Sequence, residues 1–364
     1  MATGRPLPGR LGDLSMSLAT DRRTHRGLLK GLIAYGMQHN SFLAAEIIPD
    51  MPMTDIVAFA RQSENELEKM IDTMEFDIDH SWLRNLSVQE EEIVFTGSDR
   101  TSVRLITYRP KNEDCPAIVY FHGGGMVMLR TESRLHTSYA KCIAKLGFMC
   151  ILVDFRNVLH SNEDDGSLHH FPAGLNDCVA AVQWIYNHRI DLKIDKIILH
   201  GDSGGANLAL ATALKLKTES IISGVFVIDP YISGAYSRPR EWKLSHLPSL
   251  IECDGYDVSC SASSLYARLY DNRGKHEVDS LAWPYWATEA EMQDLPPHLI
   301  LVAELDPLRD EGVEYCRRLE RAGVRATGRV RMGMTHTGEL LLRAYVKSEF
   351  LDLLGDLRSF VDKL

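Results

Sequence analysis

No part of this sequence approaches a run of about eighteen uncharged apolar residues, the length that a membrane-spanning helix requires. The first residues also lack the apolar segment of a secretory signal peptide, because charged side chains such as Arg5, Arg10 and Asp13 interrupt them. We therefore expect no membrane span and no secretory leader, and we predict a cytoplasmic location.

An excess of basic residues is also missing. Lysine and arginine together number 40, against 50 aspartate and glutamate residues, which gives a net charge of -10 at pH 7. Surfaces that bind nucleic acid or anionic membranes need a basic face, so we predict no nucleic-acid partner. Neutral or cationic small molecules are easier partners for such a chain, and a homodimer stays open.

The sequence has neither a paired cysteine motif nor a recognised histidine ligand pattern. Its seven cysteines are odd in number, and several lie within apolar strand or helix patterns, so we interpret them as reduced core residues. His160, His169 and His170 share one irregular segment, but their spacing places no two of them on one helical face beside a carboxylate. We interpret this segment as a solvated loop and predict no metal site.

Short apolar runs alternate with helical patterns over most of the chain, whose 45% hydrophobic and 25% charged residues are typical of a globular protein. This alternation predicts an α/β fold with a mostly parallel sheet and helices on both faces. Strands are expected at 91–95, 103–108, 117–121, 148–155, 197–199, 224–228, 298–303 and 326–332. Helices are expected at 132–146, 173–187, 206–217, 311–322 and 340–364.

Two parts of the chain depart from this alternation. Residues 25–74 have a helical pattern that precedes the sheet and forms either half of a lid or plain scaffold. Residues 231–297 form a long, aromatic, turn-rich insertion, which we expect to supply the rest of a cap. The predicted units are 1–88 (N-terminal arm and cap helices), 89–230 (first part of the core), 231–297 (cap insertion) and 298–364 (second part of the core).

The insertion contains three tryptophans, Trp242, Trp283 and Trp286. Aromatic side chains present large apolar surfaces at low entropic cost and often line pockets for apolar ligands. We therefore predict that these residues contribute to substrate binding. The alternative is that they form a small core within the cap itself.

The stretch from residue 196 to residue 217 predicts a strand, a sharp turn and a helix. Ser203 lies at the turn, in Gly201-Asp202-Ser203-Gly204-Gly205. Small residues are needed on both sides of such a serine, because its backbone is strained and strand and helix pack closely there. The helix that follows directs its free amides at any oxyanion that forms beside the hydroxyl. We predict that Ser203 is a nucleophile.

A second glycine-rich segment, His122-Gly123-Gly124-Gly125, follows the predicted strand at 117–121. Consecutive glycines leave backbone amides unshielded, so this loop is suited to bind an anion. A tight turn without a binding role is the alternative, although three glycines in a row are entropically costly.

Asp306 and His336 each follow a predicted strand, as Ser203 does. The carboxyl ends of parallel strands meet at one edge of a sheet, so we expect these three side chains to lie together. A serine needs a histidine to take its proton, and the histidine needs a carboxylate to fix its tautomer. Asp306 could instead cap a helix, Asp310 is a rival carboxylate, and His336 could be an ordinary loop histidine.

With these residues in hand, the sequence resembles the hormone-sensitive-lipase-like family of α/β-hydrolases over about residues 90–340. The resemblance rests on 122–125 (HGGG), 201–205 (GDSGG), 306–312 (DPLRDEG) and His336. It implies an α/β-hydrolase fold with a mostly parallel eight-stranded sheet and a helical cap, and carboxylic-ester hydrolysis without a cofactor. It also assigns the oxyanion hole to the amides of Gly123, Gly124 and Gly204.

We therefore predict a serine esterase that cleaves a small to medium, largely apolar ester, a lactone or an acetylated metabolite through an acyl-enzyme. Its partner would be that small-molecule ester. Two alternatives stay open at this point. One is a non-hydrolytic acyltransferase or cyclase on the same fold, and the other is a ligand receptor that has lost turnover.

Overall fold

The computed structural model describes residues 7–39, 51–76, 87–97, 99–110, 114–160 and 167–364. Residues 40–50 of the predicted N-terminal helical region and residues 161–166 of the predicted histidine-bearing loop lie outside this part. The described chain folds around one eight-stranded sheet, ordered β1-β2-β4-β3-β5-β6-β7-β8. The strands are β1 Val88–Thr96, β2 Ser102–Pro110, β3 Ala117–Phe121, β4 Met149–Asp154, β5 Ile197–Asp202, β6 Gly224–Ile228, β7 His298–Ala303 and β8 Ala326–Arg331.

The strand directions follow from the connections between them. β1 and β2 form an antiparallel pair, and β2 is also antiparallel to β4. β3 to β8 are mutually parallel, because a helix connects most of these strands in sequence. The central strands β3, β5, β6 and β7 are buried along their whole length, whereas the edge strands β1 and β8 are largely exposed. The predicted fold class is confirmed.

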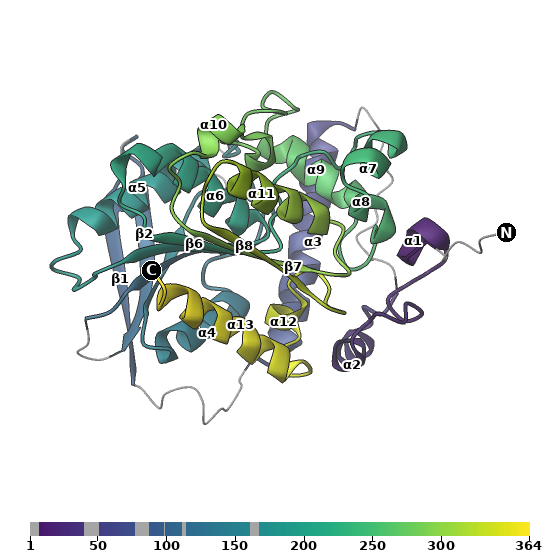
Figure 1. Ribbon diagram of the computed structural model, residues 1–364, viewed down its shortest axis with the longest axis horizontal. Helices are drawn as coiled ribbons and strands as arrows, with labels where there is room; N and C mark the ends of the chain where they lie inside the picture. Colours follow the sequence, from purple (N-terminus) through teal and green to yellow (C-terminus); the bar gives the residue numbers. More distant parts are fainter. Residues whose placement is uncertain (1–6, 40–50, 77–86, 98, 111–113, 161–166) are drawn as a thin grey trace.

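Helices cover both faces of the sheet, as Figure 1 shows. α5 (Ala173–Asn187), α6 (Gly204–Leu216) and α11 (Arg309–Arg321) lie on one face and share a large apolar core with the cap. α4 (Arg134–Lys145) and α13 (Lys347–Val361) lie on the other face over a separate apolar core. The site described below belongs to the first face.

The predicted C-terminal helix is interrupted. The structure has two helices there, α12 (Gly338–Leu341) and α13 (Lys347–Val361). Between them the fully buried side chain of Arg343 donates from Nε to the carbonyl oxygen of Leu340 at 3.0 Å. A continuous helix would use that oxygen for the amide of Ala344, so the buried arginine competes with the helical pattern.

The cap combines the N-terminal segment with the insertion after β6. α3 (Met53–Thr73) packs beside α9 (Cys260–Tyr270), and the rings of Phe59 and Tyr266 stack with their centroids 6.0 Å apart. The remaining helices of these segments and connections are α1 Gly9–Gly12, α2 Arg26–Ala34, η1 Lys217–Glu219, α7 Arg240–His246, α8 Ser249–Glu252, η2 Pro284–Trp286 and α10 Glu289–Met292. That the cap and the core are separate units stays a prediction.

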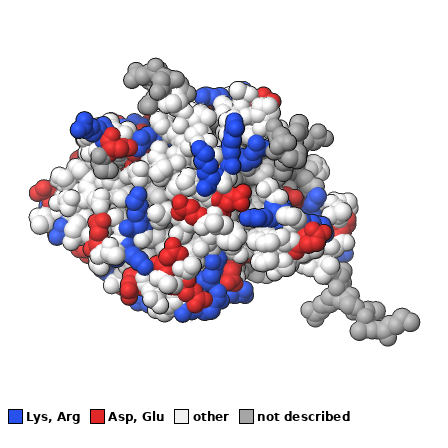
Figure 2. All heavy atoms as spheres, turned by 90° about the horizontal axis from the view of Figure 1, so that it is seen from above, with Lys and Arg blue, Asp and Glu red and all other residues white. Residues whose placement is uncertain are grey.

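The described part of the N-terminal arm packs against the rest of the chain. Leu18 is fully buried, and Arg23 forms ion pairs with Asp21 and with Glu252 of α8. The face of the molecule in Figure 2 carries both acidic and basic side chains. Among the described helices, none combines the length and apolar character needed to cross a bilayer.

Candidate active site

Ser203 stands at a sharp turn between β5 and α6, as the sequence predicts. Its backbone has φ 54° and ψ −118°, a conformation that side-chain-bearing residues rarely adopt. Its amide donates to the carbonyl oxygen of Ile228 on β6 at 2.9 Å, which ties the turn to the sheet. A Cβ atom at Gly205 would lie 1.9 Å from the carbonyl oxygen of Phe121, so only glycine fits beside the serine there.

The glycine-rich loop after β3 packs directly on this turn. A Cβ atom at Gly204 would lie 2.7 Å from the backbone nitrogen of Gly125, so the two glycine motifs are in contact. Gly124 has φ +106°, which favours glycine. Within the described chain, the amides of Gly123, Gly124 and Gly204 donate no hydrogen bond. They are therefore free to receive an oxyanion beside Ser203.

His122, the first residue of this loop, stabilises it by a hydrogen bond and by ring stacking. Its Nδ1 lies 2.7 Å from the carbonyl oxygen of Gly123, and its ring stacks on His136 and on Phe155. Burial lowers the pKa of His122 to about 4, so the ring is neutral and Nδ1–H donates this bond.

His336 and Asp306 meet where the sequence places them, after β8 and β7. Nδ1 of His336 donates to Oδ2 of Asp306 at 2.7 Å, and Oδ1 of Asp306 accepts from the amide of Leu308 at 2.8 Å. Both side chains are buried. The rival carboxylate of Asp310 accepts instead from the amide of Ser249 at 2.6 Å. The structure thus brings Asp306 to His336 and directs Asp310 elsewhere.

Asp229 is a third buried carboxylate at this edge of the sheet. It accepts from the amide of Ala303 at 2.7 Å and from the amide of Thr337 at 2.7 Å, and it pairs with Arg331 at 2.6 Å. It therefore joins the end of β7 to the segment that carries His336. Sequence analysis did not single out Asp229, because it directly follows β6 without a distinguishing motif.

Asp229, Asp306 and His336 are also the one group of described side chains that offers metal-ligand atoms within 4.8 Å of one another. Their ligand atoms already bond to protein groups, Asp306 to His336 and Asp229 to Arg331 and two amides. This arrangement fits a hydrogen-bonded catalytic pair with a positioning carboxylate.

The electrostatic environment favours a protonated His336. Burial lowers its pKa, but the charge and the hydrogen bond of Asp306, together with the charges of Asp229 and Asp257, outweigh burial and raise the pKa to about 9. A histidine that acts as a base must be neutral. The rate of any reaction that uses His336 as its base should therefore rise as the pH approaches this pKa.

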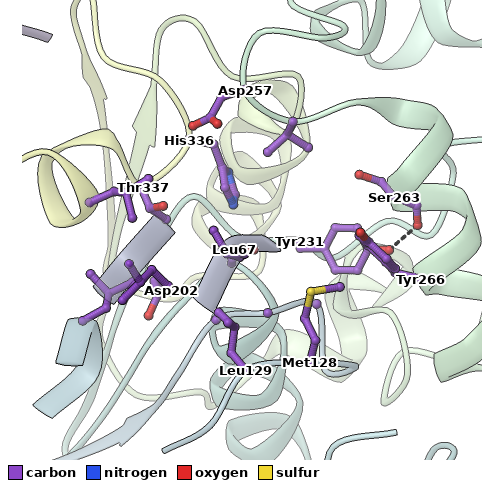
Figure 3. Close-up of a pocket in the computed structure, with 18 of the residues that line it drawn as sticks. Leu67, Met128, Leu129, Asp202, Tyr231, Asp257, Ser263, Tyr266, His336 and Thr337 are labelled. Carbon is purple, nitrogen blue, oxygen red and sulfur yellow. Dashed lines mark hydrogen bonds between the residues drawn. The ribbon is translucent and has the colours of Figure 1, made fainter. Parts of the chain in front are cut away.

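Ser203 and His336 line one cavity of about 170 Å³ (Figure 3). The glycine-rich loop forms one wall, Leu67 and Met70 of α3 form another, and Tyr266 of α9 closes the cavity from the insertion. Among the described residues, no hydrogen bond joins Oγ of Ser203 to His336. Such contacts often tighten only when substrate binds.

The three tryptophans predicted to bind substrate are absent from the described residues that line this cavity. Trp283 is fully buried against Tyr231 and Tyr270, with ring centroids 5.6 and 5.5 Å apart. Trp242 stacks on His246, and Nε1 of Trp286 donates to the carbonyl oxygen of Ser233 at 2.8 Å. Trp283 thus belongs to the core of the cap, whereas Trp242 and Trp286 are half-buried, and a substrate-binding role for the three tryptophans stays a prediction.

The cavity is lined by other residues of α3 and of the insertion. α3 contributes Leu67, Met70 and Ile71 to the cavity, and the insertion contributes Tyr231, Asp257, Val258, Ser263 and Tyr266. The helical spacing of the α3 residues was visible in the sequence. Nothing in the sequence indicated which face of α3 meets the serine, and Asp257 had no local signal at all.

Residues 118–339 match a family described as the alpha/beta hydrolase fold. The esterase LipI of Mycobacterium tuberculosis is 28% identical over 241 residues, which cover 65% of this chain and 68% of that protein. A solved structure of brefeldin A esterase, described as a bacterial homologue of human hormone-sensitive lipase, is 35% identical with a TM-score of 0.92 and covers 98% of both chains. The esterase Est22 is 31% identical with a TM-score of 0.81, covering 94% of this chain and 98% of that chain.

Proposed function

This chain belongs to the hormone-sensitive-lipase-like family of α/β-hydrolases and is a carboxylesterase-type hydrolase, and we propose that Ser203, His336 and Asp306 perform its reaction. The observation that carries this proposal is the 2.7 Å hydrogen bond from His336 to Asp306 at the cavity that Ser203 also lines. The strained backbone of Ser203 adds support, because strain of this kind is concentrated at functional sites.

The reaction proceeds in two stages. His336 takes the proton of Ser203 Oγ, and Oγ attacks the ester carbonyl carbon while the amides of Gly123, Gly124 and Gly204 bind the oxyanion. When the tetrahedral intermediate collapses, His336 returns the proton to the alkoxide and the alcohol leaves. Water then attacks the acyl-enzyme with His336 as the base, and His336 returns the proton to Ser203 Oγ as the free acid is released. Asp306 holds the imidazole and stabilises its charged form.

The cavity suits a small to medium, largely apolar ester. Its walls consist mainly of methionine, leucine and tyrosine side chains from α3, from the segment that follows the glycine-rich loop and from the insertion. A lactone or an acetylated metabolite presents the same carbonyl group and is included in this class.

We further propose that the protein acts in the cytoplasm without a nucleic-acid partner, in keeping with its net charge of -10. Whether it acts as a monomer or as a homodimer stays open.

Turnover of p-nitrophenyl esters by the Ser203→Ala variant tests the proposal. We expect a loss of about 10³-fold or more in kcat, because a triad without its nucleophile retains only binding and oxyanion stabilisation. Circular dichroism should show that the variant is folded. Near-parental turnover would remove Ser203 from the mechanism.

Product analysis of the parent protein separates hydrolysis from the alternatives. Hydrolysis releases the free acid in water even when an alcohol acceptor is present. Acyl transfer or cyclisation would give an ester or lactone instead, and a receptor would give no product.

A further inference from the structure

Asp257 places a carboxylate in the cavity beside the proposed catalytic histidine. It lies in the loop between α8 and α9, and Figure 3 shows its side chain next to His336. It is half-buried, and it forms no hydrogen bond or ion pair with any residue that the structure describes. The proposed mechanism gives Asp257 no task.

The loop holds Asp257 in this position by contacts on both sides. Oδ1 of Asp254 accepts from the amide of Cys260 at 2.8 Å, which fixes the start of α9. The hydroxyl of Tyr256 donates to Oδ2 of Asp21 in the N-terminal arm at 3.1 Å. Asp257 itself has φ +69°, a conformation that aspartate and asparagine tolerate better than most residues. Its inward position is therefore fixed by its neighbours.

The surroundings of Asp257 in the cavity are suited to a positive charge. Neither lysine nor arginine is among the described residues that line the cavity. The rings of Tyr231 and Tyr266 and the thioethers of Met70 and Met128 supply polarisable surface. Burial raises the pKa of Asp257 to about 6, so its carboxylate is still ionised above pH 7. In the reactive state, in which His336 is neutral, a substrate cation beside Asp257 would thus meet one negative charge that no described side chain bonds.

The position of Asp257 also indicates which part of the ester it contacts. His336 must reach the oxygen of the leaving alcohol to protonate it, so the alcohol part lies on the side of His336. Asp257 is next to His336, and both line the cavity. Groups near the leaving oxygen are therefore the ones within reach of Asp257.

Resting on the esterase function proposed above, we infer that Asp257 gives this enzyme a preference for esters whose alcohol part carries a positively charged amine. The carboxylate would pair with the substituted ammonium group. The preference goes beyond ester hydrolysis itself, which the triad and the glycine-rich loop supply without Asp257.

A matched pair of substrates tests this inference. Butyrylcholine and its carbon isostere, in which a tert-butyl group replaces the trimethylammonium group, differ in charge but hardly in shape. We expect the parent enzyme to favour the choline ester in kcat/KM by about tenfold or more, because about 1.4 kcal/mol of charge attraction corresponds to a factor of ten. Asp257→Asn should lose this preference, while Asp257→Glu should keep part of it. Asparagine tolerates the positive φ, so the Asn variant should fold.

Two controls separate this inference from the proposed function. Glu277→Gln removes one negative charge from the exposed cap surface, away from the cavity, and should leave the preference unchanged. Hydrolysis of p-nitrophenyl butyrate by Asp257→Asn should continue, whereas a failure of the proposed function would abolish hydrolysis of both ester types by the parent protein.

The pH profile for the neutral ester gives a second measurement. His336 faces the carboxylates of Asp306, Asp229, Asp257 and, more distantly, Asp202. Removing the charge of Asp257 should lower the pKa of His336, so the rise of kcat/KM should move to lower pH. A pH shift without loss of the choline preference, equal preference in the parent, or a preference only for a cation in the acyl part would overturn the inference.

Discussion

At the scale of single residues, the proposed site separates groups that look equivalent in the sequence. Asp306 and Asp310 lie four residues apart after the same strand, and either could serve the histidine. The structure gives them different partners, His336 for Asp306 and the amide of Ser249 for Asp310. The difference follows from α11, which begins at Arg309 and directs Asp310 toward α8.

The two aspartates should therefore respond differently to loss of charge. We expect Asp306→Asn to lower kcat by about 10⁴-fold, because the histidine would adopt the wrong tautomer. Asp310→Asn should change kcat little and reduce the free energy of unfolding by about 1 kcal/mol, the usual contribution of one such hydrogen bond. Steady-state kinetics on both variants make the comparison. The opposite ranking would transfer the orienting role to Asp310.

Sequence reasoning at this scale found residues that belong to motifs and missed those that do not. Ser203, Asp306 and His336 each follow a strand, and parallel strands bring such positions together without further information. Asp229 and Asp257 lie near His336 in the folded structure, and their charges raise its pKa. That proximity arises from packing between distant segments, so no local pattern reveals it.

At the scale of elements, the turn at Ser203 depends on close packing between β3, β5 and α6. Gly205, in the first turn of α6, packs against the carbonyl oxygens of Phe121 and His122, and a Cβ atom there would lie 1.9 Å from the first of them. Gly355, in α13, provides a comparison, because a Cβ atom at that position would meet nothing within 4 Å.

Alanine at these two helical glycines should have opposite effects on stability. Gly205→Ala should lower the free energy of unfolding by about 2 kcal/mol or more, because strand and helix must separate to admit the methyl group. Gly355→Ala should raise it by about 0.5–1 kcal/mol, since alanine favours a helix more than glycine does. Urea denaturation measures both. If both substitutions changed the free energy of unfolding by the same amount, strand and helix at Gly205 would be able to separate without loss of stability.

The cap contains two classes of apolar side chain with different expected roles. Trp283 is fully buried in the cap core, whereas Met70 of α3 is half-buried and lines the cavity. The sequence could not separate these classes, because the aromatic insertion is equally consistent with a pocket wall and with a core. Only the packing of α3 against α9 determines which side chains face the serine.

Substitutions in these two classes should separate stability from specificity. Trp283→Ala should reduce the free energy of unfolding by about 3–5 kcal/mol, the usual cost of removing a buried aromatic ring. Met70→Ala should instead change the preference between short and long acyl p-nitrophenyl esters by about 1–3 kcal/mol, the range of an apolar pocket contact. Thermal denaturation and a chain-length series measure the two effects. An altered preference without destabilisation for Trp283→Ala would instead support the predicted role of Trp283 in substrate binding.

At the scale of the whole molecule, the sequence predicted the core more fully than the cap. Alternating strands and helices determine a parallel sheet almost alone, because each strand is a short apolar run and each helix has a periodic apolar face. The cap lacks such a repeat. Its helices are short, apart from α3 and α9, and one large apolar core joins the N-terminal arm, the insertion and one face of the sheet. Long-range packing of this kind leaves no regular signal in the sequence.

The central claim is that Ser203 forms a covalent acyl-enzyme, and the mass of a trapped intermediate tests it most directly. The protein would be mixed with a p-nitrophenyl ester of a hindered acid that is released slowly, quenched in acid and digested for peptide mass spectrometry. We predict one acyl group per chain, located on Ser203, and no acyl group on the Ser203→Ala variant under the same conditions. An acyl group on another residue, or steady release of p-nitrophenol without any covalent intermediate, would contradict the proposed mechanism.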